Sequence, residues 1–590
     1  MSGETTDAGA DAGPGARMDA RTDAPPAALP GERAGAPRWL QFLVLATALL
    51  LVWNSLGDHA LFPPDEGRYG SVSAWMVEHG NWLQPQLRDQ VHVTKPPLTY
   101  WSQAAGILLL GPCELAVRLP SAVGASILLI TLFWFARRNC GSVVATLAVG
   151  LYAVMPLPLI VGRLGSTDSL LAAWWWLALC MGYLAFAQAP PGRRVHLGWL
   201  AAFWGATALI GLTKGPLILA PLTIVWAWLL LAGRWRDLWR THPFFGLPLA
   251  IAPLAIVAAL YWQANPERTA RIWRFEFVDR FTGEGGHNDP LWMFVPIFLG
   301  GFFPASAMMT LPLANLSIRR AWSFLRGGDL RALLLVAVIL PFIGFSILSG
   351  KQPTYILPLG APLALVTALM LRRWIDGAEA DHPADERLPD VRVTGAAAMT
   401  IACLGTVAAA VWAVLAERAP SWAPGWTLVW WSLVLVTPML GWLACAFVWR
   451  DRGARPAGLF LAFAGMAAMW LGVQSIENRA MQAMSSRPLA AMLAEGKRPV
   501  LNCSLRNLTI DFYLGRWLDY TETSDGIQPW LAQHPGGMVV IADGDLDRMR
   551  AKRPQDFDGL RETARFDVWP MKQAVVMEAL GPGVVPAQGR

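Results

Sequence analysis

The sequence predicts a membrane-embedded, all-α domain of about thirteen transmembrane helices, followed by a small extracytoplasmic α/β domain. Three observations lead to this fold class. Of the 590 residues, 54% are hydrophobic and only 15% are charged, which is unlike a soluble protein. Apolar segments of roughly 17 to 25 residues recur, close to the length that a spanning helix needs. From about residue 478 the composition becomes globular.

Charge and cysteine content exclude several other classes of protein. The net charge is +6, but most arginines lie in short loops between apolar segments, where they set membrane orientation. We therefore expect no nucleic-acid partner. The six cysteines are scattered without paired spacing, so neither a disulfide framework nor a zinc motif is predicted.

The chain begins with a tail over residues 1–37 that we expect to be disordered and cytoplasmic, because it has almost no large apolar side chains. The first apolar segment, 39–56, has no small-residue cleavage site after it, so it is expected to remain as a span. The transmembrane domain is predicted over 38–477.

The remaining spans follow from the apolar segments alone. They are expected near 114–136, 143–161, 168–188, 196–213, 216–232, 243–263, 291–313, 331–349, 353–371, 394–416, 426–449 and 456–476.

Arginine placement supports one orientation for all of these spans. Arginines fall in every second loop, as expected if the N-terminus is cytoplasmic. They are Arg137, Arg138, Arg193, Arg194, Arg234, Arg236, Arg240, Arg319, Arg320, Arg326, Arg372, Arg373, Arg450, Arg452 and Arg455. The loops between them, and everything after about 477, should then share the outer side of the membrane.

Two outer segments are more than connectors. The segment 63–112 contains two stretches, 66–79 and 98–110, that are predicted to be helices lying along the membrane surface. The segment 264–290 is long, charged and aromatic, which is typical of a lid over a functional site.

The last part, 478–590, is predicted to be a periplasmic α/β domain. Strands are expected near 500–505, 538–542, 561–568 and 573–579, and helices near 484–495, 507–515, 525–534 and 545–552. No phosphate-binding or zinc motif occurs there, so no chemistry is assigned to it.

Placing an ionisable residue at the membrane margin costs free energy, so each one is a candidate for a structural or functional role. Asp65 follows two prolines and precedes a predicted helix, so it is either a helix cap or a carboxylate held for catalysis. Asp168 opens a span, where the helix dipole alone would favour it. Lys95 precedes two prolines that force an extended backbone, so it either anchors at the interface or binds phosphate.

Six ordered motifs resemble the ArnT-like branch of the lipid-linked sugar transferases, which are related to protein O-mannosyltransferases and share the GT-C membrane fold. The motifs are Pro-Asp65-Glu66-Gly-Arg68-Tyr69, Lys95-Pro-Pro-Leu-x-Tyr100-Trp101, Ala116-Val-Arg118-Leu-Pro-Ser121, Arg163-x-Gly-x-x-Asp168, Gly211-Leu-x-Lys214-Gly-Pro and Ser349-Gly-Lys351-x-Pro-Thr-Tyr355. The C-terminal Phe512-Tyr-Leu-Gly-Arg516 fits the same plan.

The resemblance implies an inverting glycosyltransferase that moves a sugar from a polyprenyl-phosphate donor to an envelope glycolipid, with lipid A and an aminoarabinose-like sugar as leading expectations. It implies Asp65 and Asp168 as catalytic residues. The leaving phosphate would be bound by Lys95, Arg68 and Tyr355, with Arg118 and an arginine of 268–280 as weaker candidates. Further pocket candidates are Glu66, Tyr69, Lys214, His287 and Lys351.

One position departs from the family pattern. The aminoarabinose transferases carry a glutamate immediately before the Lys-Pro-Pro lysine, which can hold zinc with a loop histidine, but this chain has Thr94. His287 matches that histidine, and one histidine is a poor zinc site. We expect no required metal, with a divalent ion at His287 as the lesser alternative, and we expect a monomer.

Two other functions remain open at this stage. The same chemistry on a protein or another glycan acceptor is the first. A lipid or solute transporter is the second, although transporters commonly place binding residues near the bilayer midplane between related halves, and no internal repeat is visible in this sequence.

Overall fold

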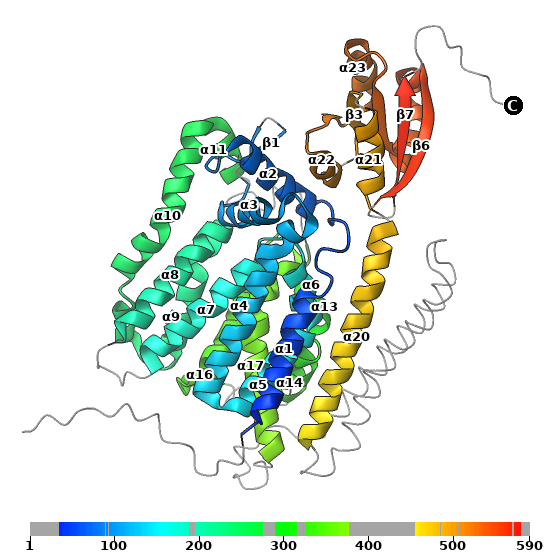
Figure 1. Cartoon of the computed structure of the whole chain (residues 1–590). Coiled ribbons are helices and arrows are strands. Elements are labelled where there is room, and N and C mark those ends of the chain that lie inside the picture. The colour runs from blue at the N-terminus through cyan, green and yellow to red at the C-terminus, as the bar shows by residue number, and fades with distance from the viewer. Residues whose placement is uncertain are drawn as a thin grey trace, which may run out of the picture.

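The protein forms a helical bundle with a mixed α/β domain at one end (Figure 1). A computed structural model describes residues 35–88, 90–92, 94–187, 195–274, 289–314, 322–323, 325–376, 455–483, 485–496, 498–505, 507–568 and 572–579. The expected spans 394–416 and 426–449 lie outside these ranges, as does His287.

The helices of the membrane domain follow one another in the order of the apolar segments. They are α1 (Arg38–Trp53), α2 (Asp65–His79), α3 (Leu98–Leu110), α4 (Glu114–Cys140), α5 (Ser142–Val154), α6 (Pro156–Arg163), α7 (Asp168–Ala187), α8 (Leu197–Lys214), α9 (Ala220–Leu231), α10 (Pro243–Ala264), α11 (Pro266–Arg274), α13 (Phe294–Gly301), α14 (Ala305–Ala314), α16 (Leu330–Ile347), α17 (Gly360–Asp376) and α20 (Arg455–Ala483). Short 3₁₀ helices include η1 (Gly215–Leu219) and η6 (Pro353–Leu359).

The expected number of about thirteen spans is only partly supported. Among the described residues, seven helical runs are long and apolar enough to cross a membrane, or eight if the bent pair α5 and α6 forms one span. The bend of 68° falls between Val154 and Pro156, where a proline begins the second helix. Helix α1 is described over 16 residues, which is shorter than a full span.

The longest of these runs, Leu197–Leu231, reverses direction in its middle. Both ends of this run lie at the end of α7. His196, just before the run, donates its amide to the Ala185 carbonyl, and Arg234, just after it, donates to the Phe186 carbonyl. Its midpoint, Lys214, instead pairs with Asp168 at the start of α7. The run is therefore a helical hairpin, as the separate expectations for 196–213 and 216–232 require.

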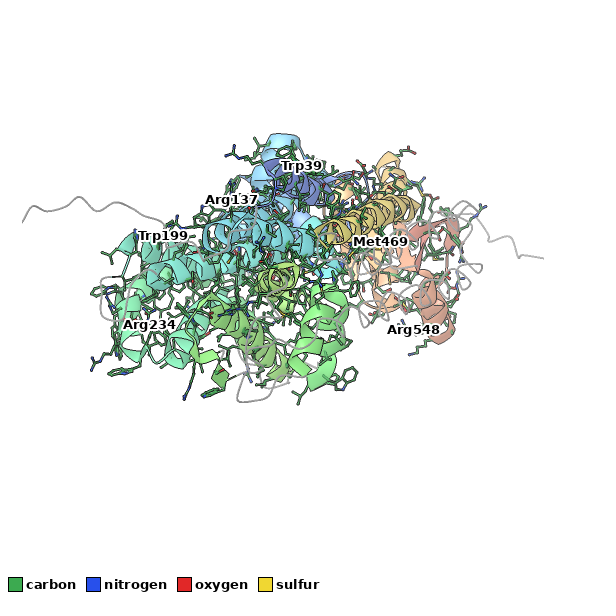
Figure 2. All side chains as sticks on the ribbon, turned by 90° about the horizontal axis from the view of Figure 1, so that it is seen from below. Trp39, Arg137, Trp199, Arg234, Met469 and Arg548 are labelled. Atoms are coloured by element: carbon green, nitrogen blue, oxygen red, sulfur yellow. The ribbon has the colours of Figure 1, made fainter. Side chains whose placement is uncertain are left out.

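The two ends of the bundle differ in content. One end carries α2, α3, α11 and the C-terminal domain (Figure 1). Figure 2 looks at the bundle from the opposite end, where Arg137 and Arg234 are labelled. The segments predicted to share the outer side thus meet at one end, and we use "outer end" for it below.

Apolar packing holds the bundle together. Helices α4, α5, α7 and α17 share one large core, in which Trp175, Trp176 and Trp228 are fully buried. Helix α10 instead exposes large side chains such as Phe244, Phe245 and Leu249, as expected for a surface that faces lipid. These observations agree with a multi-pass membrane protein.

Helices α2 and α3 lie across the outer end and pack on each other through Tyr69, Val72, Met76 and Tyr100. Both were expected as helices from their sequence. Helix α2 ends at Gly80, whose φ of 64° is a left-handed conformation that glycine adopts readily. The hairpin β1 (Gln86–Leu87) and β2 (Gln90–Val91) lies between the two helices in sequence.

The segment 264–290 is partly helical, which differs from the loop that we expected. Helix α11 occupies its first part, and residues 275–288 are outside the described ranges. The local sequence explains the helix: the Asn265 side chain accepts from the Arg268 amide as a cap, Pro266 is the first helical residue, and Arg271 and Arg274 lie in the last turn.

The C-terminal domain has a five-stranded sheet in the order β4-β3-β5-β7-β6. Strand β3 pairs parallel with β4 and β5, whereas β7 pairs antiparallel with β5 and β6. Its elements are α21 (Arg487–Glu495), β3 (Val500–Cys503), α22 (Thr509–Leu514), β4 (Asp519–Thr521), α23 (Ile527–Gln533), β5 (Met538–Ala542), α24 (Asp543–Lys552), β6 (Leu560–Val568) and β7 (Lys572–Ala579). The expected α/β composition is confirmed, and β4 was not predicted.

Candidate active site

The first turn of α2 presents Asp65 and Arg68 at the outer end. Asp65 is the first helical residue and makes no capping hydrogen bond; its side chain is 52% exposed and forms an ion pair with Arg68 one turn later. Arg68 also donates to the Tyr69 hydroxyl at 3.3 Å and lies 5.0 Å from the centre of the Tyr69 ring. A cation is thus held between a carboxylate and an aromatic ring.

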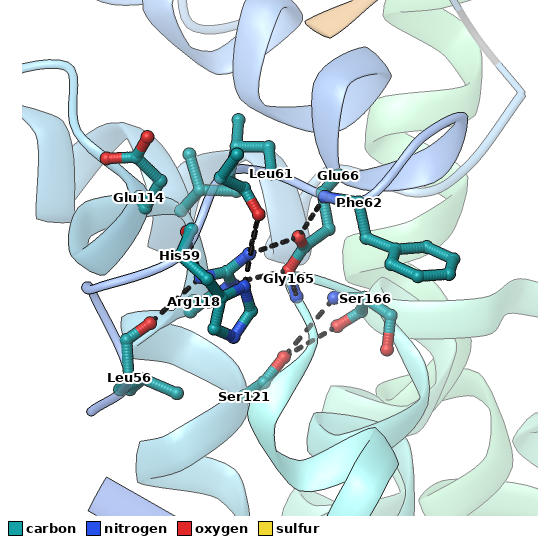
Figure 3. A network of polar contacts seen from close by, with 12 residues as sticks. Leu56, His59, Leu61, Phe62, Glu66, Glu114, Arg118, Ser121, Gly165 and Ser166 are labelled. Carbon is teal, nitrogen blue, oxygen red and sulfur yellow. Dashed lines mark hydrogen bonds and ion pairs between the residues drawn. The ribbon is translucent and has the colours of Figure 1, made fainter. Parts of the chain in front are cut away.

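Glu66, the next residue, has a different environment (Figure 3). Its carboxylate is buried and accepts from Arg118 Nε at 2.9 Å and Nη2 at 2.7 Å. The backbone amides of Gly165 and Phe62 also donate to it. Burial alone would raise the pKa of Glu66, but Arg118 and these amides together hold that pKa below its usual value.

Arg118 is therefore engaged in contacts within the protein. It is fully buried, and its remaining donors bind three backbone carbonyls, those of Leu56, His59 and Ala60. The pair joins α2, α4 and the turn before α7 (Figure 3). All of the N–H donors of Arg118 thus have partners within the protein, and its expected role as a weaker phosphate candidate stays a prediction.

A second ion pair lies at the outer ends of α7 and α8. Asp168, the first residue of α7, accepts from Lys214 Nζ, the last residue of α8, at 2.6 Å. Lys214 Nζ also lies 4.6 Å from the centre of the Tyr355 ring in η6. Three elements that are far apart in sequence thus bring Asp168, Lys214 and Tyr355 together.

Tyr69 connects the two ion pairs. Burial raises the pKa of Tyr69, and the charges of Asp65 and of Asp168 raise it further, so both carboxylates are close to its ring. The ring of Tyr100 packs edge-on against Tyr69 at 5.7 Å. The charges of the two expected catalytic carboxylates therefore both act on one buried tyrosine.

Besides the two ion pairs, the site contains a buried histidine, His92, with Lys95 among the cations that act on it. The pKa of His92 is lowered to about 3, first by burial and then by the positive charges of Arg68, Arg268 and Lys95. Its Nε2 lies 2.8 Å from Thr94 Oγ1. Three positive side chains, from α2, α11 and the Lys-Pro-Pro motif, thus approach one buried ring.

Several buried polar atoms around these groups have no hydrogen-bond partner among the described residues. They include Arg68 Nε, Arg268 Nε and the Tyr261 hydroxyl. The Tyr100 hydroxyl instead lies beside Thr94, whose Oγ1 is 2.8 Å from His92 Nε2. Because buried polar groups are nearly always paired, these atoms indicate the position of a polar or anionic ligand.

Of two further expected pocket residues, Lys351 and His287, the structure describes only Lys351. Lys351 is buried, and its Nζ donates to the carbonyls of Asp289 at 2.8 Å and Leu348 at 2.5 Å. Its own amide donates to the Asp289 carboxylate at 2.9 Å. These contacts bind the turn between α16 and η6 to the end of the segment 264–290, and His287 is outside the described residues.

Three residues of the site were not expected from sequence. Tyr100 was visible in the Lys-Pro-Pro motif but was given no role. His92 and Tyr261 stand out only as a histidine in an outer loop and a tyrosine at the end of an apolar helix. Neither pattern indicates a ligand without the structure.

The described residues contain no group of three or more His, Cys, Asp or Glu that could hold a metal ion. The Thr94 hydroxyl, at the position of the family's metal-binding glutamate, is bonded to His92. A neutral hydroxyl with one imidazole does not make a zinc site. The expectation that no metal is required stays a prediction.

Comparison with solved structures decides the fold. The crystal structure of ArnT from Cupriavidus metallidurans bound to undecaprenyl phosphate matches with a TM-score of 0.73 at 21% identity, over 93% of this chain and 99% of that chain. The apo form matches with a TM-score of 0.68 at 20% identity, over the same shares of both chains. The protein has the ArnT fold.

Sequence comparison agrees with this fold. A family model described as dolichyl-phosphate-mannose-protein mannosyltransferase matches residues 94–262. The undecaprenyl phosphate-alpha-4-amino-4-deoxy-L-arabinose arabinosyl transferase of Edwardsiella ictaluri is 32% identical over 345 residues, 57% of this chain and 59% of that protein. A second such enzyme, from Pseudomonas fluorescens, is 32% identical over 339 residues, 56% of this chain and 59% of that protein.

The resemblance to ArnT-like, GT-C transferases is therefore confirmed in sequence and in fold. The aligned part spans 59% of the length of both relatives, so their activity and substrates are considered below as a proposal.

Proposed function

We propose that this protein is an inverting glycosyltransferase that transfers an aminoarabinose-like sugar from a polyprenyl phosphate to lipid A at the outer face of a bacterial inner membrane. The observation that carries the proposal is the meeting of Asp65, Arg68, Asp168, Lys214 and Tyr355 at one end of a membrane bundle. A donor with a lipid tail in the bilayer would present its phosphodiester at this depth.

The cations account for the leaving group. As the bond between the anomeric carbon and the phosphate oxygen breaks, the electron pair passes to that oxygen, and the phosphate gains about one negative charge. Preorganised cations stabilise developing charge most where water is excluded. Arg68 and Lys95 approach the same buried histidine, and the Arg68 Nε has no partner among the described residues, so we assign these two to the phosphate.

Lys214 and Tyr355 are assigned to the same phosphate from the opposite side. Lys214 has its charge balanced by Asp168 at 2.6 Å, so Asp168 fixes the position of the ammonium group. The Tyr355 ring lies against that ammonium group. Arg118 is proposed to act only as the partner of Glu66, because its donors are already engaged.

Asp65 is assigned to the acceptor. A phosphate of lipid A has a second pKa near ~6 and is largely ionised at neutral pH, so it attacks the anomeric carbon without losing a proton. Asp65 then orients the acceptor. With a hydroxyl acceptor, Asp65 would have to take the proton.

Two other functions are weighed against this proposal. A protein or another glycan acceptor fits the same donor site, and Thr94 is where this chain departs from the aminoarabinose transferases. A transporter fits less well, because the polar residues gather at one end of the bundle and not at its centre.

The test compares envelope lipids by mass spectrometry in cells that express the intact protein or Asp65→Asn at equal membrane levels. Glu78→Gln, an exposed carboxylate on the same helix, is the matched control. We expect an added aminopentose on lipid A with the intact protein and the control, and its loss with Asp65→Asn. An addition on another glycan would support the first alternative, and an unchanged envelope in all strains would contradict the proposal.

A further inference from the structure

The C-terminal domain contacts the helix that carries Asp65 and Arg68. Helix α22 lies beside α2 at the outer end (Figure 1). The Leu61 amide, just before α2, donates to the Tyr513 hydroxyl at 2.8 Å. Phe512 packs against Leu61 and Val117 in a small apolar cluster. A segment more than 430 residues away in sequence thus covers the start of α2.

Gly67 determines how closely the two segments approach. A Cβ atom at Gly67 would lie 2.5 Å from the Thr509 amide nitrogen and 2.8 Å from the Leu508 carbonyl carbon. Both are backbone atoms, so no side-chain rotation relieves the clash. At Gly70, one turn later, a Cβ would meet the Phe512 ring at 3.2 Å. The backbone of the C-terminal domain therefore rests directly on the backbone of α2.

Two polar contacts hold the domain in this position. Glu114, at the start of α4, is buried and accepts from Tyr513 at 2.8 Å and from Arg487 Nε at 2.7 Å. Arg88, beside the β1–β2 hairpin, lies 3.4 Å from the buried carboxylate of Asp511 and 4.4 Å from the centre of the Tyr520 ring. Arg88 and Glu114 both follow α2 in sequence, so the domain is bound to the segments after α2 as well as to α2 itself.

On its other side, α2 is fixed by Glu66, which is bound to Arg118 and Gly165. Gly67 and Arg68 follow Glu66 directly. A shift of the backbone at Gly67 would therefore move Asp65 and Arg68 relative to Lys214 and Tyr355, which belong to other elements. Misplacement of reacting groups by about 1 Å can cost about 100-fold in rate.

We propose that the C-terminal domain is a positioning element of the active site: its segment Leu508–Tyr513 holds α2 in place, and Gly67 is the positioning residue that permits the contact. The proposal rests on the proposed glycosyl transfer for its kinetic readout. It gives a function to the Phe512-Tyr-Leu-Gly-Arg516 motif, to which the chemistry assigns none.

The test uses the full-length protein in lipid nanodiscs and two variants that disturb the contact differently. Gly67→Ala introduces the clash, whereas Tyr513→Phe removes one oxygen and introduces no new atom. Gly205→Ala is the matched control, because a Cβ there meets nothing within 4 Å. The measurements are kcat for sugar transfer, the Kd of undecaprenyl phosphate, and hydrogen exchange of the α2 amides.

For Gly67→Ala we expect faster exchange in α2 and a fall in kcat of about tenfold or more, because Asp65 and Arg68 move with α2. The Kd of undecaprenyl phosphate should rise as well, because Arg68 is assigned to the phosphate, but binding should persist because Lys95, Lys214 and Tyr355 lie outside α2. Tyr513→Phe should change exchange and kcat in the same direction by a smaller factor. Gly205→Ala should match wild type.

The inference is overturned by faster exchange in α2 with an unchanged kcat, and equally by a fall in kcat with wild-type exchange. If the wild-type protein transfers no sugar, the proposed function fails. If wild type is active and both interface variants match Gly205→Ala, only the positioning role fails.

Discussion

Adjacent residues on α2 have opposite environments, and this difference can be measured. Glu66 is buried with Arg118, whereas the Asp65 side chain is half exposed beside Arg68. Removing one partner of a buried pair leaves an uncompensated charge and costs about 3–5 kcal/mol, but exposed pairs contribute about 0–1 kcal/mol.

We therefore predict that Glu66→Gln lowers the free energy of unfolding by about 3–5 kcal/mol. Asp65→Asn should change it by less than about 1 kcal/mol while abolishing transfer. Thermal unfolding in one detergent measures both variants. Equal free energies of unfolding for the two variants would show that the ion pair of Glu66 with Arg118 does not stabilise the fold more than that of Asp65 with Arg68.

His92 gives the site a predicted pH dependence. Its pKa is about 3 in the folded protein and 6.5 in an unfolded chain, so the folded state binds fewer protons between these values. The stability from neutral His92 is fully present above pH 6.5 and is lost as the pH falls from 6.5 toward 3.

We predict that wild type loses more thermal stability than His92→Gln when the pH is lowered from 7.5 to 5.5. His79→Gln, which alters an exposed histidine on α2, is the control and should behave as wild type. Parallel losses in wild type and His92→Gln would show that His92 is not held neutral by the fold.

At the scale of elements, Asp168 and Lys214 join α7 to the α8–α9 hairpin. Because the two side chains contact each other, their substitutions should not be additive. We predict a coupling free energy of about 1–3 kcal/mol in a cycle of Asp168→Asn, Lys214→Met and the double variant, measured as undecaprenyl phosphate affinity. Additive effects would mean that the two residues act separately.

The sequence was informative where periodicity and length determine an element. Helices α2 and α3 and most strands of the C-terminal domain were predicted near their observed bounds. Helix α11 was missed because its charges and aromatic residues suggested a loop, although Asn265-Pro266-Glu267 is a helix-start signal. Strand β4 is only three residues long, which is too short to give a pattern.

The sequence motifs identified most residues of the candidate site, but not which residues each of them contacts. Motif order marked Asp65, Lys95, Asp168 and Lys214. Sequence alone could not show that Arg118 is buried with Glu66, or that Lys351 binds the backbone of Asp289. Such pairs join segments that are far apart in sequence, and only the packed bundle determines which side chains face each other.

At the scale of the whole molecule, the proposed function requires the site and the C-terminal domain to share the periplasmic side. We predict that a membrane-impermeant maleimide labels Glu78→Cys in intact spheroplasts, and that it labels Arg137→Cys only after permeabilisation. Both substitutions are made in a chain without its six native cysteines. The reverse labelling pattern would contradict the arginine-based orientation.

The proposed function requires the protein to transfer a sugar from a polyprenyl phosphate with the residues at its outer end, which are Asp65, Arg68, Lys95, Asp168, Lys214 and Tyr355. The most direct test supplies the purified protein in liposomes with undecaprenyl-phosphate aminoarabinose and lipid A, and follows both products by mass spectrometry. We predict equal amounts of undecaprenyl phosphate and modified lipid A, and a rate reduced by about 10–100-fold in Lys95→Ala because one charged phosphate contact is lost. Lys552→Ala, a surface change on α24, should match wild type. An unconsumed donor, or equal rates for the two lysine variants, would contradict the account.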